Sequence, residues 1–349
     1  MCGIAGYFNK NKQDSYTKNK VSLMLDSIIH RGPDDFGIHL EDNFGSIGMR
    51  RLSIQDLSSN GHQPMFDESS LVCLVFNGEI YNANKKRDEL LVAGFNFNSR
   101  SDTEVVLNLY LNFGDDFLDH LEGMFAIAII DKREDRINPK LFMARDQVGI
   151  KPLYYSMNDE MFSFCSELTP FISAGIIKPN LNPNSLRQLL NYGSVKQPNT
   201  IFNGVYMLMP GHKLIYQNGN FECIKYWSLE NKLNQFRSNL ITSESPLIRV
   251  ENSLRESVKN HLCGDVKIGT FLSGGIDSSL MAALLSIESP KTISTYSVGF
   301  NTNSDIKSEL SKAKMTSKYL GTDHNEIIVN EKYVLDNIET FISFTIISL

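Results

Sequence analysis

The spacing of apolar residues changes near Ser245, and the change divides the chain into two parts with different architectures. A helix that begins at Pro246 leads into regular alternation between strand-like and helical runs. Such alternation is typical of a parallel sheet with helices packed on its faces. The strand-like runs of this second part are 266–272, 292–300 and 326–329. We therefore expect an α/β fold after Ser245.

The first part mixes short strand-like runs with isolated helices, which is typical of an α+β domain. Apolar residues at helical spacing predict a helix over 21–29, and Ser101 to Glu104 form a capping-box pattern for a helix that Gly114 would end. The expected strands are 46–54, 71–76, 124–131, 141–145 and 161–166, with a hairpin of 207–216 and 221–227. The polar residues 228–243 are interpreted as a linker.

Composition excludes several classes of protein. The 349 residues suffice for two domains, and 42% of them are hydrophobic, so a substantial core can form. The formal net charge of −6 argues against nucleic-acid binding, which needs a basic face for phosphates. The longest candidate apolar run, 124–130, is too short to cross a bilayer, and the N-terminus lacks the features of a signal peptide. We expect a soluble, cytoplasmic protein with neither nucleic-acid nor membrane partners.

Cysteine usage sets one residue apart. The five cysteines are far apart and form no C-x-x-C pair, which disfavours a zinc ribbon or a disulfide framework. Cys2 directly follows the initiator Met, and removal of that Met would leave one residue with both a thiol and a free α-amine. The amine, with a pKa of about 7.7–8.0 against about 8.5 for a thiol, could then serve as the base for the nucleophile. Taken alone, position 2 could equally hold any residue.

Six short blocks resemble the glutamine-hydrolysing asparagine synthetases, which are class II amidotransferases with an N-terminal nucleophile. The blocks are residues 1–6 (MCGIAG), 30–35 (HRGPDD), 51–54 (RLSI), 76–82 (FNGEIYN), 101–104 (SDTE) and 144–146 (ARD). The resemblance implies an αββα sandwich of the N-terminal-nucleophile glutaminase type, followed by an incomplete α/β domain of the ATP-pyrophosphatase, adenine nucleotide alpha hydrolase-like kind. The expected divisions are a glutamine amidotransferase domain over 2–211, a hairpin and linker over 212–244, and the N-terminal part of the ATP-pyrophosphatase domain over 245–349.

The resemblance also implies roles for individual residues. Cys2 would attack the glutamine amide, and the Asn77 side chain and the Gly78 backbone N–H would form the oxyanion hole. Each such donor is typically worth about 2.7–4 kcal/mol in the transition state. Arg51 would bind the substrate α-carboxylate, because its planar guanidinium matches that geometry. The other implied glutamine-binding residues are Glu79 and Asp102 for the ammonium, and Leu52, Ile54 and Gln55, through backbone groups, for the pocket wall.

Each of these blocks also has a plain structural interpretation. Asn77-Gly78 alone is typical of a type I′ hairpin turn, and Asp102 alone is typical of a helix N-terminus. His30 with Asp34 and Asp35 could suggest a metal site, but the Gly-Pro pair between them favours a structural loop near the thiol. None of these interpretations explains why the blocks occur together with a cysteine at position 2.

A second set of motif residues lies between the strand-like run 266–272 and a helical run. Two glycines and a helix N-terminus would turn backbone N–H groups toward an anion, without the lysine of a Walker A loop. The segment resembles the pyrophosphate loop of ATP pyrophosphatases; a plain glycine-rich turn is the alternative, and the Gly-x-Ser-x-Gly elbow of serine hydrolases is missing. The implied ATP-binding residues are Leu272, Ser273, Gly274, Gly275, Asp277, Ser278, Ser279 and, near the base, Val298. Mg²⁺ would arrive with ATP and could be positioned by Asp277, so no separate metal site is expected.

Three functions compete at this point. The first is glutamine-dependent asparagine synthesis, in which ammonia from glutamine aminates a β-aspartyl-AMP formed from aspartate and ATP, with AMP and PPi as the other products. The second is a related amidotransferase acting on a sugar acid or peptide, as in surface-polysaccharide biosynthesis. The third is a non-enzymatic interaction protein that retains a glutamine pocket. The expected partners are the small molecules glutamine, aspartate and ATP, and a homodimer is left open.

The end of the chain departs from the family pattern. That pattern continues with a second nucleotide loop and a lysine, neither of which this sequence contains. Residues 342–349 are mostly apolar, where an acidic segment would be expected. We therefore expect a C-terminally truncated chain that hydrolyses glutamine, makes no asparagine and has an aggregation-prone tail. A short natural variant whose tail packs on the sheet is the alternative.

Overall fold

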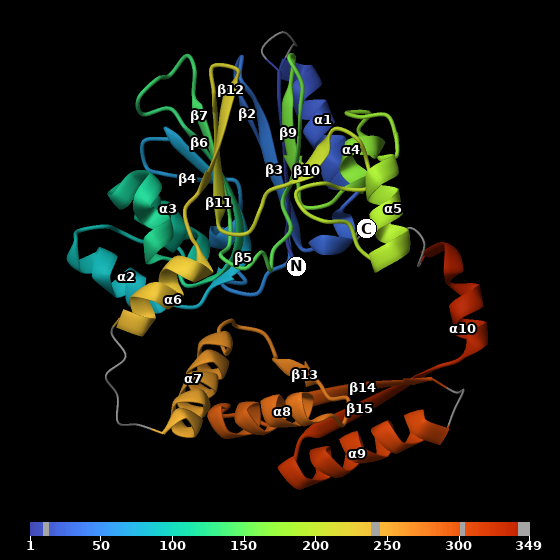
Figure 1. Cartoon of the computed structure of the whole chain (residues 1–349). Helices are drawn as coiled ribbons and strands as arrows, with labels where there is room; N and C mark the ends of the chain where they lie inside the picture. Colours follow the sequence, from blue (N-terminus) through green and yellow to red (C-terminus); the bar gives the residue numbers. More distant parts are fainter. Residues whose placement is uncertain (10–13, 239–244, 301–303, 341–349) are drawn as a thin grey trace. The chain divides into compact units, whose positions relative to one another are not determined.

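The protein is described by a computed structural model that covers residues 1–9, 14–238, 245–300 and 304–340 (Figure 1). Internal contacts divide the chain into two compact units, one made mainly of Met1–Asn239 and the other of Leu240–Ser343. The first unit is built on antiparallel sheets, and the second on the parallel sheet that the apolar spacing predicts. The apolar tail expected to aggregate, 342–349, lies outside the described residues.

The first unit contains two six-stranded antiparallel sheets. The first sheet has the order β10-β8-β9-β1-β3-β2, with β1 at Gly3–Phe8, β2 at Asp35–Glu41, β3 at Gly45–Arg51, β8 at Tyr154–Met157, β9 at Phe162–Cys165 and β10 at Val205–Met207. The second has the order β12-β11-β7-β6-β5-β4, with β4 at Met65–Phe66, β5 at Val72–Ile80, β6 at Gly123–Asp131, β7 at Lys140–Arg145, β11 at His212–Gln217 and β12 at Asn220–Lys225. The helices are α1 (Asp14–Asp26), α2 (Ala83–Val92), α3 (Asp102–Phe113), α4 (Thr169–Ser173), α5 (Pro183–Tyr192) and α6 (Leu229–Ser238).

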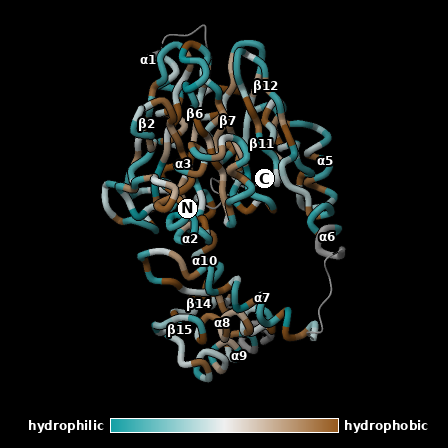
Figure 2. Tube along the Cα trace, turned by 90° about the vertical axis from the view of Figure 1, so that its left-hand side faces the viewer, coloured by the Kyte–Doolittle hydropathy of each residue, from teal (hydrophilic) through white to brown (hydrophobic). Residues whose placement is uncertain are grey.

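Three buried clusters hold the layers of this unit together. Phe8 and Val75 belong to the cluster between the two sheets, and Figure 2 shows β6 and β7 as mainly hydrophobic because both faces of these strands are buried. Tyr110 of α3 packs on the outer face of the second sheet, and Val21 of α1 packs on the outer face of the first. Helices on the outside of two stacked sheets make the expected αββα sandwich (Figure 1).

The predicted hairpin forms as β11 and β12, but it is part of the first unit rather than of a linker. Strand β11 pairs with β7 and extends the second sheet, and Leu214 is buried between the sheets. A division at residue 211 would therefore cut a sheet. The linker expected over 228–243 contains helix α6, in which Leu229 and Leu233 recur at helical spacing. Its residues 239–243 lie outside the described part of the chain.

Ser101 is the N-cap of helix α3 as predicted, but without a reciprocal capping box. The Ser101 hydroxyl accepts a hydrogen bond from the Thr103 N–H (3.2 Å), whereas Glu104 accepts from the Ser99 N–H (2.7 Å) in the preceding loop. Gly114, with φ of +58°, ends the helix. Glu104 binds the preceding loop and not the Ser101 N–H, because both the N–H and the hydroxyl of Ser99 donate to its carboxylate.

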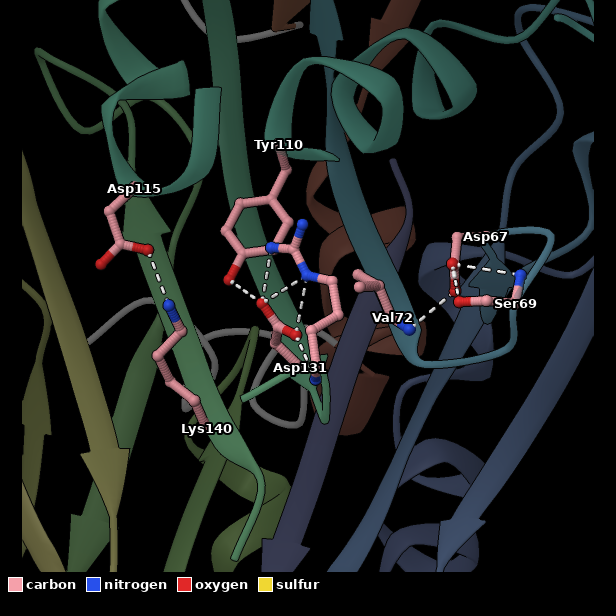
Figure 3. Close-up of polar contacts among 8 residues, drawn as sticks. Asp67, Ser69, Val72, Tyr110, Asp115, Asp131 and Lys140 are labelled. Atoms are coloured by element: carbon pink, nitrogen blue, oxygen red, sulfur yellow. Dashed lines mark hydrogen bonds and ion pairs between the residues drawn. The ribbon is translucent and has the colours of Figure 1, made fainter. Parts of the chain in front are cut away.

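A polar cluster ties α3 to the second sheet (Figure 3). The Tyr110 hydroxyl donates to Asp131 at the end of β6 (2.8 Å), and Arg133 pairs with the same carboxylate (2.7 Å). Lys140 of β7 pairs with Asp115 (2.9 Å) just beyond the helix. These contacts hold α3 on the second sheet. They thereby also fix the position of Asp102, the first residue of this helix.

The second unit is a parallel sheet with the order β13-β14-β15. Its elements are α7 (Pro246–His261), β13 (Gly269–Phe271), α8 (Ile276–Glu288), β14 (Ser294–Phe300), α9 (Ser304–Leu320), β15 (Asp323–Val329) and α10 (Glu331–Asp336). Along β14, Thr295 and Ser297 are buried, whereas Tyr296, Val298 and Phe300 are exposed. Within the described part of the chain, no helix combines the length and the hydrophobicity that a membrane span requires.

Candidate active site

A pocket with an empty volume of about 290 Å³ lies where Cys2, the end of β3, the end of β5 and the start of α3 meet. Its wall includes eight residues that the sequence implied for glutamine: Cys2, Arg51, Leu52, Ile54, Gln55, Gly78, Glu79 and Asp102. It also includes Met49, Gln63, Phe76, Ser101 and Thr103, for which the sequence suggested no role. Residues up to a hundred positions apart in the chain thus line one small space.

The Cys2 thiol lies against the backbone of Leu52. Strand β1 pairs with β3 so that Gly3 faces Arg50, and this register brings Cys2 beside the residue that follows β3. The Leu52 N–H donates to Cys2 Sγ at 3.4 Å. Burial raises the pKa of the Cys2 thiol, although the Leu52 N–H acts in the opposite direction. The thiol is therefore protonated near neutral pH and needs a base before it can act as a nucleophile.

Arg31 holds the backbone of Cys2 in place. Its Nε donates to the Cys2 carbonyl oxygen (2.9 Å), and its Nη1 donates to Glu167 (2.8 Å), which is 2% exposed. The sequence placed this loop near the thiol but did not reveal the contact. No local signal could have done so, because Arg31 and Cys2 are 29 residues apart.

His30, Asp34 and Asp35 do not converge on a common point. His30 contacts Glu167 (3.0 Å), Asp34 accepts from the Ser53 N–H (2.8 Å) and Asp35 pairs with His62 (2.8 Å). These separate contacts fasten the loop to its neighbours, which is the structural interpretation of this block. Among the described residues, no group of three or more His, Cys, Asp or Glu side chains is placed to hold a metal ion.

Asn77 and Gly78 lie inside strand β5 and not in a hairpin turn, because they pair with Ala126 and Phe125 of β6. Alternate residues of β5 face opposite layers, so the Asn77 side chain shares the face of Val75, between the two sheets, where Cys2 also packs. Asn77 is 1% exposed, and its Nδ2 has no hydrogen-bond partner within the described residues. A buried amide donor with no partner among the described residues is thus available on the inner face of the second sheet, the layer against which Cys2 packs.

The backbone N–H of Gly78 points to the pocket edge of β5. The Phe76 N–H donates to the Gln63 side chain on that edge (2.7 Å), and the Ile80 N–H donates to Asp102 (3.0 Å). Residues two apart in a strand direct their N–H groups to the same edge, so the Gly78 N–H lies between these two. Glycine is required here by the neighbouring strand, since a Cβ would lie 2.4 Å from the Met124 carbonyl oxygen.

Two carboxylates, the buried Asp102 and the half-buried Glu79, share one neighbour. The side-chain Nε2 of Gln55 donates to Glu79 at 2.6 Å and to Asp102 at 3.3 Å. Burial, with a further contribution from the nearby Glu79 carboxylate, raises the pKa of Asp102 to about 7. Burial likewise raises the pKa of Glu79. The pair gains stability when a positively charged group lies against it.

Arg51 lies in the pocket wall and also supports the loop that follows β3. Its guanidinium donates to the backbone carbonyl oxygens of Gln55 (3.2 Å), Asp56 and Ser58 (3.1 Å). Gln63, another wall residue, joins β5 to α3 by accepting from the Phe76 N–H and donating to the Thr103 hydroxyl (3.0 Å). The partners of Gln63 are 13 and 40 residues away, so sequence reasoning had no pattern from which to find it.

In the second unit, the loop from Ser273 to Gly275 joins β13 to α8. The Ser273 and Ser278 hydroxyls are 3.0 Å apart, and Gly274 has φ of +79°. Leu272 is buried, and its N–H donates to the Tyr296 carbonyl oxygen (2.8 Å). This residue therefore attaches the start of the loop to β14.

The other implied ATP-binding residues lie close to this loop in the chain or in the sheet. Asp277 and Ser279 are in the first turn of α8, and Asp277 is exposed. Val298 is on β14, two residues beyond the partner of the Leu272 N–H, and is 49% exposed. The second unit therefore places these residues at the carboxyl end of β13 and along the adjoining strand.

Replacing Gly274 with alanine is expected to destabilise the second unit by about 1–3 kcal/mol. The positive φ strains any side chain, and a Cβ would lie 2.7 Å from the Glu309 carbonyl oxygen of α9. Hydrogen exchange of the β13 and α8 amides measures the effect. Gly275→Ala is the matched control for stability, because a Cβ there meets only the Ser273 hydroxyl, at 3.5 Å. Equal protection in both variants would contradict the prediction.

Comparison with known proteins identifies the first unit. Residues 1–227 match the family model of the glutamine amidotransferase domain. The chain belongs to the glutamine amidotransferase family. Residues 249–345 of this amidotransferase match the family model named asparagine synthase. The two matches fall on the two units that the structure separates.

Three curated relatives illustrate the similarity. The amidotransferase is 31% identical to asparagine synthetase (glutamine-hydrolyzing) 3 of Bacillus subtilis, over 97% of this chain and 56% of that protein. It is 35% identical to asparagine synthetase (glutamine-hydrolyzing) 1 of the same organism, over 96% and 51%. It is 33% identical to amidase chry2 of Gibberella zeae, over 97% and 52%. The chain thus spans about half the length of the curated relatives it matches.

Proposed function

We propose that this amidotransferase is a glutamine-dependent asparagine synthase. Glutamine would be hydrolysed in the pocket of the first unit, and the ammonia would aminate a β-aspartyl-AMP formed from aspartate and ATP. The observation that carries the glutaminase step is that a thiol, Gly78 and a carboxylate pair line one pocket. Asn77, whose buried Nδ2 has no partner within the described residues, precedes Gly78 on the same strand. Similarity to asparagine synthetases along both units supports aspartate as the acceptor. A cytoplasmic location belongs to the same proposal.

Glutamine would enter as a zwitterion with its side-chain amide beside the thiol. Glu79 and Asp102 would hold the α-ammonium, since both carboxylates line the pocket and already accept from one donor. Arg51 would contribute its guanidinium to the α-carboxylate from the pocket wall. Leu52 and Ile54 would complete the wall around the carbon chain. This orientation directs the substrate amide toward Cys2.

The thiol would attack the amide carbon after the initiator Met has been removed. The freed α-amine of Cys2 would take the thiol proton, and a carbon–sulfur bond would form as the amide oxygen becomes negatively charged. The Asn77 side chain and the Gly78 N–H would stabilise that oxygen. The protonated amine would return its proton to the leaving nitrogen, which releases ammonia. Water would then hydrolyse the thioester to glutamate.

The loop of the second unit has the donors that a nucleotide needs. It is exposed, it presents the Ser273 and Ser278 hydroxyls, and the first N–H groups of α8 have no partner within the helix. Open space beside Gly275 leaves room for a phosphate group. Mg²⁺ would neutralise phosphate charge when it arrives with ATP, and Asp277 is the carboxylate of this loop that would position it.

Product analysis tests the proposal. Protein is incubated with glutamine labelled with ¹⁵N in its side-chain amide, together with aspartate, ATP and Mg²⁺, and the products are identified by mass spectrometry. The proposal predicts glutamate, ¹⁵N-asparagine, AMP and PPi, whereas the expectation drawn from the sequence alone is glutamine hydrolysis without asparagine. Glutamate and ammonia alone, unchanged by ATP, would support the glutaminase-only alternative and overturn asparagine synthesis by this chain. Absence of both glutamate and ammonia would overturn the glutaminase step as well.

Glutamine binding is expected to weaken as the pH falls below about 7. The pKa of Asp102 is raised to about 7, and a protonated carboxyl group cannot balance the substrate ammonium. Affinity measured on a Cys2→Ala variant, which separates binding from chemistry, should fall by up to about tenfold per pH unit there. Asp102→Asn should weaken binding by at least about tenfold at pH 8 and remove this dependence. Asp88→Asn, on the exposed face of α2, is the control and should retain both the affinity and its pH profile.

A further inference from the structure

The Gln55 side chain lies where the proposed function places the ammonium of glutamine. One nitrogen, Nε2, reaches Glu79 at 2.6 Å and Asp102 at 3.3 Å, and a primary amide has two N–H groups to donate to two carboxylate oxygens. An α-ammonium would offer the same donors with a full positive charge. Gln55 and both carboxylates line the pocket, so the three side chains surround the same space.

The backbone of Gln55 is held separately from its side chain. Its carbonyl oxygen accepts from Arg51 Nη2 at 3.2 Å, which ties the residue to the end of β3. Rotation of the side chain would therefore break the hydrogen bonds to Glu79 and Asp102 and leave the backbone of Gln55 bound to Arg51. The Gln55 amide can therefore change rotamer without movement of the backbone that carries it.

We propose that the Gln55 side chain occupies the ammonium subsite of the free protein and is displaced by the α-amine of glutamine. The inference rests on the proposed function, because it requires that glutamine binds in this pocket. A neutral amide leaves two carboxylate charges uncompensated, whereas an ammonium forms charge-assisted hydrogen bonds that are about twice as strong as neutral ones. Ligands with an α-amine can therefore displace Gln55, and ligands without one cannot.

Displacement makes Gln55 a specificity-determining residue for this pocket. A ligand that lacks the α-amine meets a subsite already filled by a matched donor and gains nothing there. A ligand with the amine loses part of its binding energy in removing Gln55 from the same carboxylates. Without the Gln55 amide, the ligand with an α-amine binds more tightly, and the affinity for the ligand without one does not change.

The test compares L-glutamine with glutaramate, which is glutamine without its α-amine. Dissociation constants are measured by calorimetry on the full chain with the Cys2→Ala substitution, at pH 8.5, where the carboxylate pair is ionised. Gln55→Met keeps the length of the side chain and removes both N–H groups. Gln55→Asn keeps an amide but is one methylene shorter, so it cannot reach both carboxylates. Gln147→Met, on a glutamine whose Nε2 contacts the Leu121 carbonyl oxygen outside the pocket, is the matched control.

Both Gln55 variants should bind L-glutamine about three- to tenfold more tightly, with the affinity for glutaramate unchanged within about twofold. The control should leave both constants unchanged. An unchanged or smaller ratio of the glutaramate to the glutamine constant, in a protein that binds glutamine, would overturn the role of Gln55 alone. Failure of the chain with native Gln55 to bind glutamine would overturn the proposed function and this inference together. Because the ratio is taken within each variant, partial loss of folded protein does not alter it.

Discussion

Replacing Cys2 with alanine is expected to lower the rate of glutamine hydrolysis by at least about 10³-fold, because no other group in the pocket can form the thioester. The fold should persist, since the thiol is only partly buried and its described hydrogen bonds are with the backbone of Leu52. Glutamate release and circular dichroism measure the two effects. Cys223→Ala is the control, because Cys223 is exposed on β12 and away from the pocket, and it should retain full activity.

The same prediction extends to the α-amine. A tag that remains attached in front of Cys2 turns the amine into an amide, which cannot accept the thiol proton. Because burial raises the pKa of the Cys2 thiol, loss of the base should reduce activity almost as severely as loss of the thiol. Undiminished glutaminase activity in the tagged protein would show that another group activates Cys2.

Asn77→Ala is expected to reduce kcat for glutamine hydrolysis by about 10²–10³-fold with little change in KM. The Asn77 Nδ2 is buried and has no hydrogen-bond partner within the described residues, so its contact forms only when an oxyanion appears beside it. For the same reason the substitution breaks no existing hydrogen bond of this nitrogen, and stability should fall far less than activity.

Steady-state kinetics on Asn77→Ala, together with thermal unfolding, tests the assignment. Asn184→Ala, at an exposed position of α5, provides a matched loss of an asparagine side chain and should alter neither parameter. A change in KM alone would mean that Asn77 binds the ground state of glutamine and does not stabilise an oxyanion. A large loss of stability would mean that the amide has a structural role in the free protein.

Local patterns in the sequence predicted the fold class of both units, α+β for the first and α/β for the second, whereas the αββα sandwich was implied by the resemblance. After Ser245, the spacing of apolar residues identifies each run as a strand or a helix without reference to its packing partner. Regular alternation of strands and helices then predicted a parallel sheet. In the first unit, residues 124–131 and 141–145 correspond to β6 and β7, whose strand character comes from nearly continuous apolar sequence. The resemblance of short blocks to asparagine synthetases then supplied the family, and the family comparison confirmed it.

Tertiary pairing decided what several ambiguous segments become. Asn77-Gly78 is a turn signal by local rules, yet it lies in a strand because β6 pairs with it along its whole length. The predicted capping box at Ser101 does not close, because the loop at Ser99 offers Glu104 better donors. The hairpin at 212–225 belongs to the first unit because β7 presents an edge to it. At Asn77-Gly78 a local preference of about 1 kcal/mol yields to hydrogen bonds with a distant strand. At Ser101 the competing donors belong to Ser99, five residues before Glu104.

The candidate site shows the same division most clearly. The sequence alone indicated which residue types could carry glutaminase chemistry, since a thiol, an amide donor and two carboxylates occur in recognisable blocks. It did not indicate that Arg31 holds the Cys2 carbonyl or that Gln55 bridges Glu79 and Asp102. Those contacts join residues 24 to 47 positions apart. Local periodicity reports only which way a side chain faces, whereas the partner it meets is set by the register in which distant strands and helices pack.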